Sequence, residues 1–172
     1  MKISIDNKTN DKLIWVTVSC SNLEEIKLRE EFYRTVLLQL LDGSSINLIT
    51  IEPQDYSLAY DIPSYRLRKI KGKNFLVNSI PKCDVELIEK IVSSEEFERT
   101  LLLIVKEQPL LSDDNLINIL DLIKGKFITK INGVIYCEDD GDSLCLYNTT
   151  VDLEELISIS KTLTDDVVTE TI

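Results

Sequence analysis

The 172-residue sequence contains no histidine. Histidine is the commonest general base and metal ligand in proteins, so its absence excludes the usual nucleophilic triads and imidazole metal sites. An enzyme would have to use carboxylate, lysine or tyrosine chemistry. The adjacent pairs Glu24-Glu25 and Glu154-Glu155 lie in expected helices, where neighbouring side chains do not face each other. Neither pair can converge on one substrate atom, and we expect a protein that is not an enzyme.

Glycine is also scarce. None of the five glycines belongs to a Gly-rich loop between a strand and a helix, so no nucleotide or phosphate site is predicted. The longest apolar run, residues 101–105, is far shorter than the about 20 residues of a membrane span. The N-terminal residues turn polar too early for a signal peptide. We expect a cytoplasmic protein with no cofactor and no membrane partner.

The cysteines have no CxxC spacing, so no structural zinc site is expected. Cys137 and Cys145 flank a turn that contains Asp140-Gly141. If these two residues form a type I′ loop, residue 137 lies opposite residue 144 and the two thiols point to opposite faces of the hairpin. Free thiols in a reducing cytoplasm are therefore expected for all four: Cys20, Cys83, Cys137 and Cys145.

Apolar residues make up 44% of the chain, enough for a sizeable core in a single domain of residues 1–172. A capping box that begins at Ser21 predicts a helix to about Leu41. Residues 54–64 have no clear period and are expected to form an irregular loop. Further helices are predicted at residues 85–92, 112–125 and 152–163, and strands at residues 13–18, 46–51, 65–70, 74–80, 100–106, 127–131, 134–138 and 144–147.

This order predicts an α+β fold with a mixed, largely antiparallel sheet and about four helices; an α/β sandwich is the alternative. Residues 100–106 are apolar on both faces, which is typical of a central strand. Residues 12–93 and 99–164 share the order strand, helix, three strands, helix. They can therefore be two β-α-β-β-β-α units in tandem. Residues 165–172 are expected to fray.

The charge is acidic and unevenly distributed. Thirty acidic residues stand against nineteen basic ones, a net charge of −11. Residues 137–172 contain ten carboxylates and one cation, Lys161, so this segment carries −9 and the first 136 residues are nearly neutral. Such a field steers and selects partners and does not specify a fold.

The acidic C-terminal segment is the predicted binding site. The turn near Asp140 and the outer face of the last helix would together present one negative surface to a basic protein partner, held by charge-assisted hydrogen bonds. The alternative is that these residues only keep the protein soluble. A calcium or magnesium site at the turn is not expected, because an EF-hand needs a twelve-residue loop. The predicted partner-binding residues are Glu138, Asp139, Asp140, Asp142, Glu154 and Glu155.

One basic cluster lies in the predicted hairpin of residues 65–80. It can hold an anion or nucleic acid, but a body with a net charge of −11 repels a polyanion. We interpret it as an edge strand protected from aggregation by cations, or as a partner for the acidic segment within the chain or across a homo-oligomer. No nucleic-acid partner is expected. The cluster comprises Arg66, Arg68, Lys69, Lys71 and Lys73.

The size, the charge and the strand-helix-hairpin run from Leu101 through Asn132-Gly133-Val134-Ile135-Tyr136 to Tyr147 together resemble a class of proteins. In these features the chain is similar to the immunity proteins of bacterial contact-dependent inhibition and other polymorphic-toxin systems. The resemblance implies a cytoplasmic inhibitor that binds a cognate toxin domain, often a nuclease with a basic cleft, and occludes its active site.

Two other functions stay open. An acidic chaperone or complex subunit would be a second kind of binding protein, and a chaperone would be a dimer with exposed apolar grooves. A histidine-free enzyme would need a pocket in which carboxylates with perturbed pKa values converge.

Overall fold

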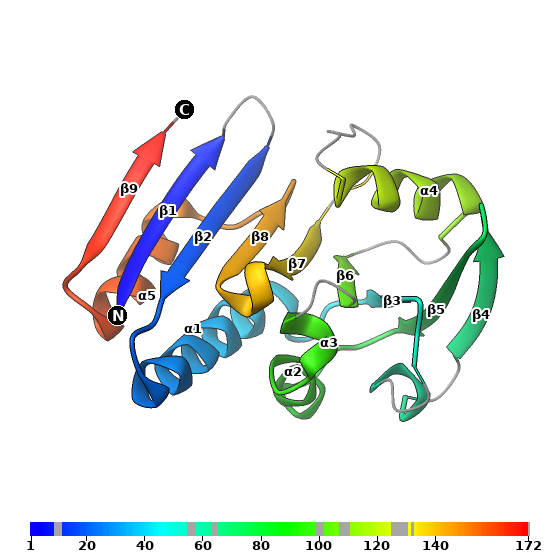
Figure 1. Ribbon diagram of the computed structural model, residues 1–172, viewed down its shortest axis with the longest axis horizontal. Helices are drawn as coiled ribbons and strands as arrows, with labels where there is room; N and C mark the ends of the chain where they lie inside the picture. Colours follow the sequence, from blue (N-terminus) through cyan, green and yellow to red (C-terminus); the bar gives the residue numbers. More distant parts are fainter. Residues whose placement is uncertain are drawn as a thin grey trace.

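The computed structural model describes residues 1–8, 12–54, 58–62, 65–98, 102–106, 111–124, 131 and 133–171. These residues form an α+β fold built on one nine-stranded sheet (Figure 1). The strands are β1 (Lys2–Lys8), β2 (Leu13–Ser19), β3 (Ile46–Ile51), β4 (Tyr65–Ile70), β5 (Lys73–Ile80), β6 (Leu102–Lys106), β7 (Val134–Glu138), β8 (Ser143–Tyr147) and β9 (Val167–Thr171). The helices are α1 (Leu23–Leu41), α2 (Val85–Val92), α3 (Glu95–Glu98), α4 (Asp113–Leu122) and α5 (Leu153–Leu163), with 3-10 turns η2 (Leu58–Tyr60) and η3 (Asp139–Gly141).

The sheet has the strand order β4-β5-β3-β6-β7-β8-β2-β1-β9. Neighbouring strands are antiparallel except β1 and β9, which are parallel. The predicted central position of residues 100–106 is confirmed, because β6 lies between β3 and β7. Its apolar side chains alternate between the two cores, with Leu102 and Ile104 in one and Leu103 and Val105 in the other.

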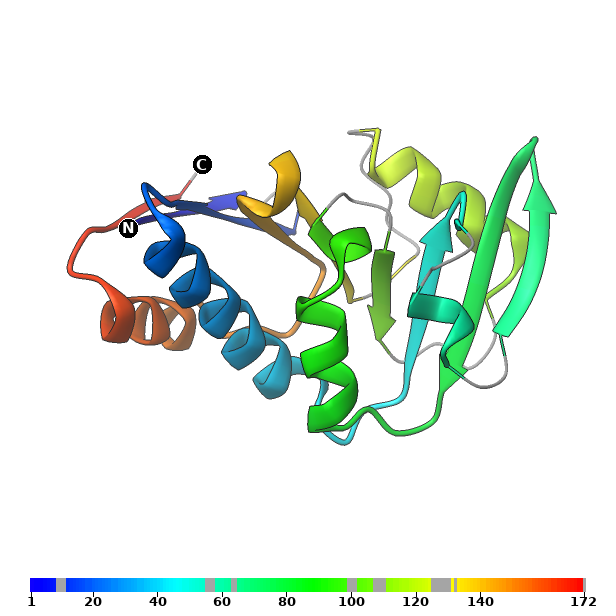
Figure 2. The same ribbon diagram turned by 60° about the horizontal axis from the view of Figure 1, so that its bottom comes forward.

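Helices cover the two faces of the sheet unequally. Helices α1, α2 and α5 lie along one face, and α4 lies on the other (Figure 2). The first core contains Phe32 and Leu37 of α1 and Ile88 of α2. The second contains Leu116 and Ile119 of α4. We call the first face the helical face; it carries the candidate site described below.

The two segments with the same order of elements do not occupy equivalent places. The first helix of one segment, α1, packs on the helical face, whereas its counterpart α4 packs on the opposite face. Strand β2 lies between β8 and β1, separated from β3 by the strands of the second segment. Both segments therefore contribute to one interleaved sheet. The expected strand at residues 127–131 lies outside the described residues except for Ile131, which is buried.

Helix α1 begins one residue later than the capping box predicted. Asn22, not Ser21, is the N-cap, and its side chain accepts hydrogen bonds from the amides of Glu24 and Glu25, both at 3.0 Å. The Glu25 carboxylate reaches back to the Ser21 amide at 2.6 Å. The box is thus shifted by one position, and Asn satisfies the first-turn amides as Ser would. The predicted end of the helix at Leu41 is confirmed.

The ends of the chain differ from the prediction. Residues 165–172 were expected to fray, but Val167–Thr171 form β9, an edge strand parallel to β1. The Ile3 amide donates to the Asp166 carbonyl at 3.0 Å. Strand β1 was not predicted, although Ile3 and Ile5 alternate with polar residues and are fully buried, which is the usual pattern of a half-buried strand.

The cysteines are free, as predicted. Cys137 pairs with Leu144 across the hairpin, so residue 137 lies opposite residue 144. Cys137 and Cys145 belong to the cores on opposite sides of the sheet. The loop between β7 and β8, however, has four residues rather than two. Among the described residues, no helix is both long enough and apolar enough to span a membrane.

Candidate functional site

The predicted acidic residues fall into two groups. The first is the acidic loop, residues 138–142, between β7 and β8. Asp139, Asp140 and Gly141 have positive φ values of 54°, 52° and 86°, a left-handed path that Asp and Gly tolerate better than most residues. Asp139 and Asp140 are exposed. Glu138 is half-buried, and burial, followed by the charge of Asp139, raises the pKa of its carboxyl.

The acidic loop is tied to α1 through a buried arginine. Arg29 is only 6% exposed, and its guanidinium donates to the Asp142 carboxylate and, at 3.3 Å, to Glu98. The Tyr33 hydroxyl donates to the Gly141 carbonyl at 2.8 Å. A Cβ atom at Gly141 would lie 3.1 Å from Cγ of Glu98. Asp142 is therefore engaged in holding the loop on the helix.

The second group, Glu154 and Glu155, lies in the first turn of α5. Glu155 accepts a hydrogen bond from Gln39 Nε2 at 3.1 Å. Gln39 and Arg29 are ten residues apart on α1, which corresponds to about 15 Å along the helix axis. The structure thus places the two predicted groups against different parts of α1 and does not gather them into one cluster.

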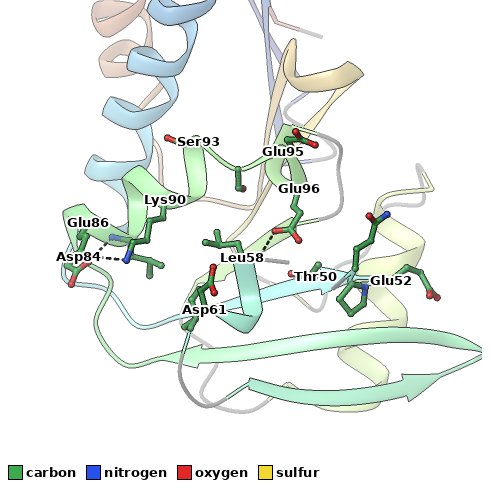
Figure 3. Close-up of a pocket in the computed structure, with 15 residues that line it drawn as sticks. Thr50, Glu52, Leu58, Asp61, Asp84, Glu86, Lys90, Ser93, Glu95 and Glu96 are labelled. Carbon is green, nitrogen blue, oxygen red and sulfur yellow. Dashed lines mark hydrogen bonds and ion pairs between the residues drawn. The ribbon is translucent and has the colours of Figure 1, made fainter. Parts of the chain in front are cut away.

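A pocket of about 900 Å³ opens elsewhere, on the helical face between β3, η2 and the α2–α3 segment (Figure 3). We call it the acidic pocket. Its volume is in the range of ligand-binding sites. It is lined by Thr50, Glu52, Pro53, Gln54, Leu58, Asp61, Ile62, Asp84, Glu86, Leu87, Lys90, Ser93, Ser94, Glu95 and Glu96.

The walls of the pocket are strongly negative. Six carboxylates and one lysine, Lys90, are among its lining residues. The Lys90 ammonium lies 2.8 Å from Glu86 Oε1. The pKa of Lys90 is raised, first by this hydrogen bond and the charge of Glu86, and further by the charges of Asp84 and Asp61. The field in the pocket therefore favours a positive charge.

The fold positions these carboxylates with backbone hydrogen bonds. Asp84 is the N-cap of α2 and accepts from the Leu87 amide at 2.9 Å. Glu96 accepts from the Leu58 amide at 2.9 Å and so holds η2 under α3. Glu52 accepts from the Asn74 amide at 3.0 Å. The Asp61 carboxylate, by contrast, has no hydrogen bond or ion pair within the described part of the chain.

A threonine at the wall of the pocket has an unsatisfied hydroxyl. Thr50 of β3 is 1% exposed, and its Oγ1 has no hydrogen-bond partner among the described residues. A buried hydroxyl without a partner costs about 1–3 kcal/mol. Figure 3 shows Thr50 among the residues that line the pocket, on the strand side.

Exposed aromatic and aliphatic side chains lie on η2, which contributes to the pocket, and on the edge strand β4. Tyr60, in the turn between Leu58 and Asp61, packs edge to face on Tyr65 with ring centroids 5.4 Å apart. Tyr65 is 47% exposed, and Leu67, two residues along β4, is 63% exposed. Tyrosine is enriched at protein interfaces. We call these three residues the aromatic rim.

The carboxylates of the pocket are spread along its walls. Within the described residues, no three Asp, Glu or Cys side chains are close enough together to hold one metal ion. A spread of separate negative charges suits an extended cationic surface, because each carboxylate can receive its own donor.

Three members of the basic cluster, Arg66, Arg68 and Lys69, are on an edge strand, as predicted, since β4 ends the sheet, whereas Lys73 begins β5. Arg68 pairs with Asp113 and the Leu111 carbonyl at the start of α4. Lys73 lies 3.8 Å from Glu52. These cations are thus paired within the first 136 residues and not with the acidic C-terminal segment.

Sequence reasoning missed the acidic pocket because its residues come from separate places between residues 50 and 96. Part of one wall belongs to residues 54–64, in which apolar residues do not recur at a regular spacing. The clearest local signal was Glu95-Glu96, which directly follows Ser93-Ser94. The chain matches no protein-family model, no curated protein and no solved structure.

Proposed function

We propose that this chain is a cytoplasmic binding protein for a basic protein partner, and that it neutralises a cognate bacterial toxin by occluding its active site. The toxin would be a nuclease, because an enzyme that binds nucleic acid has a basic cleft. The acidic pocket carries the proposal: six carboxylates line one concave surface. Charge complementarity of this kind speeds association and excludes wrong partners.

The aromatic rim supports a protein partner over a small ion. Tyr65 and Leu67 are exposed on β4, Tyr65 packs on Tyr60 of η2, and an interface needs an apolar anchor as well as charge. The carboxylates would set orientation and association rate, and the rim would slow dissociation. A partner whose basic cleft is held against this surface would be closed to its substrate.

The test is a pull-down with tagged protein from its native cell, washed at low and at high salt. We expect one basic protein at equal stoichiometry, eluted by salt because the contact is electrostatic. The purified partner should cleave nucleic acid, and adding the chain should stop the cleavage. A chain that captures no partner, or whose partner is indifferent to salt or keeps its activity, would contradict the proposal.

A further inference from the structure

The acidic pocket contains one group that nothing in the described chain satisfies. Thr50 Oγ1 is buried and has no hydrogen-bond partner, although β3 could carry valine there with the same shape. A buried hydroxyl without a partner is suited to a ligand that supplies a donor. Because Thr50 lines the pocket, that donor would come from the pocket side.

The carboxylates near Thr50 still have acceptor capacity. Glu96 uses Oε2 for the Leu58 amide, and each carboxylate offers about four acceptor positions. The Asp61 carboxylate makes no hydrogen bond or ion pair with a described residue. On the opposite wall, Lys90 already neutralises Glu86. Glu96 and Asp61 therefore keep acceptor positions that no described residue fills.

The pocket also offers apolar contacts. Leu58, Ile62 and Leu87 line the pocket together with the acidic residues, and they are partly buried against the core of the helical face. A ligand that matches this lining has a positively charged end and an aliphatic stem. Arginine and lysine side chains have this form, and both bury their stems while the head keeps its hydrogen bonds.

We propose that the acidic pocket receives one arginine or lysine side chain of the protein partner, with its charged head at Thr50 and Glu96. This inference rests on the proposed function, whose partner it makes specific. The volume of about 900 Å³ also leaves room for part of the loop that carries the side chain. The aromatic rim would contact the residues on either side of it.

The first experiment uses small probes and backbone amide NMR. The probes are n-butylguanidinium, n-butylammonium and the uncharged isostere n-butylurea. We expect both cations to shift the resonances of Thr50, Leu58 and Ile62 with a dissociation constant on the order of 1 mM, and n-butylurea to leave them in place. Equal binding of the uncharged probe, or no shift by either cation, would overturn the proposal.

Variants then assign the contacts. Thr50→Val keeps the shape and removes the hydroxyl, so cation binding should weaken about fivefold while the melting temperature stays the same or rises. Glu96→Gln should weaken binding roughly tenfold. Thr149→Val is the matched control, because Thr149 also has a buried hydroxyl without a partner but does not line the pocket. If Thr149→Val weakened binding as much as Thr50→Val, the assignment to the pocket would be wrong.

The last experiment distinguishes a failure of this inference from a failure of the proposed function. With the captured partner, a double-mutant cycle should find one partner arginine or lysine whose replacement by alanine is coupled to Glu96→Gln. If the partner binds and none of its basic residues is coupled, the inference fails and the proposed function stands. If no partner is captured, the proposed function fails whatever the probes do. Saturation by spermidine at micromolar concentration, with partner binding unaffected, would assign the pocket to free polyamines and overturn the inference.

Discussion

The acidic loop and the acidic pocket carry similar chemistry but use it differently. In the loop, Asp142 is paired with the buried Arg29, and Gly141 accepts from Tyr33, so part of the negative charge holds the loop on α1. In the pocket, Asp84 and Glu96 accept from backbone amides, which orients them without neutralising them. A carboxylate oriented by amides keeps its field for a partner, whereas one paired with arginine does not.

The comparison also shows what counting charges along the chain leaves out. The first 136 residues are nearly neutral in sum, yet they supply all six carboxylates of the pocket. The fold separates part of the charge: Arg66, Arg68 and Lys69 lie on β4 at the edge of the sheet, whereas Lys73 and Lys90 stay near Glu52 and Glu86. A surface field depends on this separation in space and not on the sum.

The largest predicted loss of stability and of partner binding comes from a substitution in the wall of the pocket. Phe97 is 1% exposed and anchors α3, the short helix that carries Glu95 and Glu96. Phe97→Ala should lower the free energy of unfolding by about 3–5 kcal/mol and abolish partner binding at temperatures where the protein is still folded. Chemical denaturation and calorimetric titration measure the two effects. Phe97→Leu is the control and should keep most of both; equal losses from the two variants would contradict this role of Phe97.

Two substitutions in the acidic loop should change the free energy of unfolding by different, smaller amounts. Asp142→Asn removes the charge that pairs with Arg29, so we expect a loss of about 1–2 kcal/mol in the free energy of unfolding. Asp140→Asn, in the same loop but exposed, should stay within about 0.5 kcal/mol. Denaturant titration measures both. If the two variants are equally stable, Arg29 does not depend on Asp142.

The rates at which the cysteines are alkylated measure the accessibility of the loop and of the pocket separately. Burial raises the pKa of Cys137, below the loop, and burial followed by the charges of Asp84 and Asp42 raises that of Cys83, beside the pocket, to about 11. Cys20 is only partly buried. In native protein at pH 8, iodoacetamide should modify Cys20 first, as followed by mass spectrometry. Asp142→Asn should then speed the modification of Cys137 and leave that of Cys83 unchanged. Faster modification of Cys83 with no change at Cys137 would contradict the role of Asp142 in holding the loop.

The smallest effect concerns pH. Burial and Asp139 raise the pKa of Glu138 in the folded protein, so folding favours its protonated form. That contribution is present below the unfolded pKa and is lost as the pH rises through the raised folded value. Glu138→Gln should therefore raise the melting temperature at pH 7 relative to the unmodified protein and lose this advantage near pH 4. A difference that does not change with pH would contradict the effect.

Sequence reasoning recovered the elements that local chemistry specifies. The bounds of β3, β4, β7 and α2 match their patterns of apolar residues, and the pairing of residues 137 and 144 followed from an even-length loop. Strand β9 escaped prediction because Val167 and Val168 gain their order from β1, at the other end of the chain. The acidic pocket escaped for the same reason: its walls come from β3, η2 and the α2–α3 segment, which are brought together only by the fold. Local propensity does not encode such contacts.

The most direct test of the central claim compares two charge reversals of equal size. Asp61→Lys with Glu96→Lys changes the pocket, and Asp139→Lys with Asp140→Lys changes the loop, so the net charge of the chain shifts by the same amount in both. Binding to the captured partner is measured by surface plasmon resonance at fixed salt. If the pocket binds the partner, we expect an affinity loss of roughly 100-fold for the pocket pair and less than about threefold for the loop pair. Equal losses would show that only the overall charge matters and would contradict this expectation.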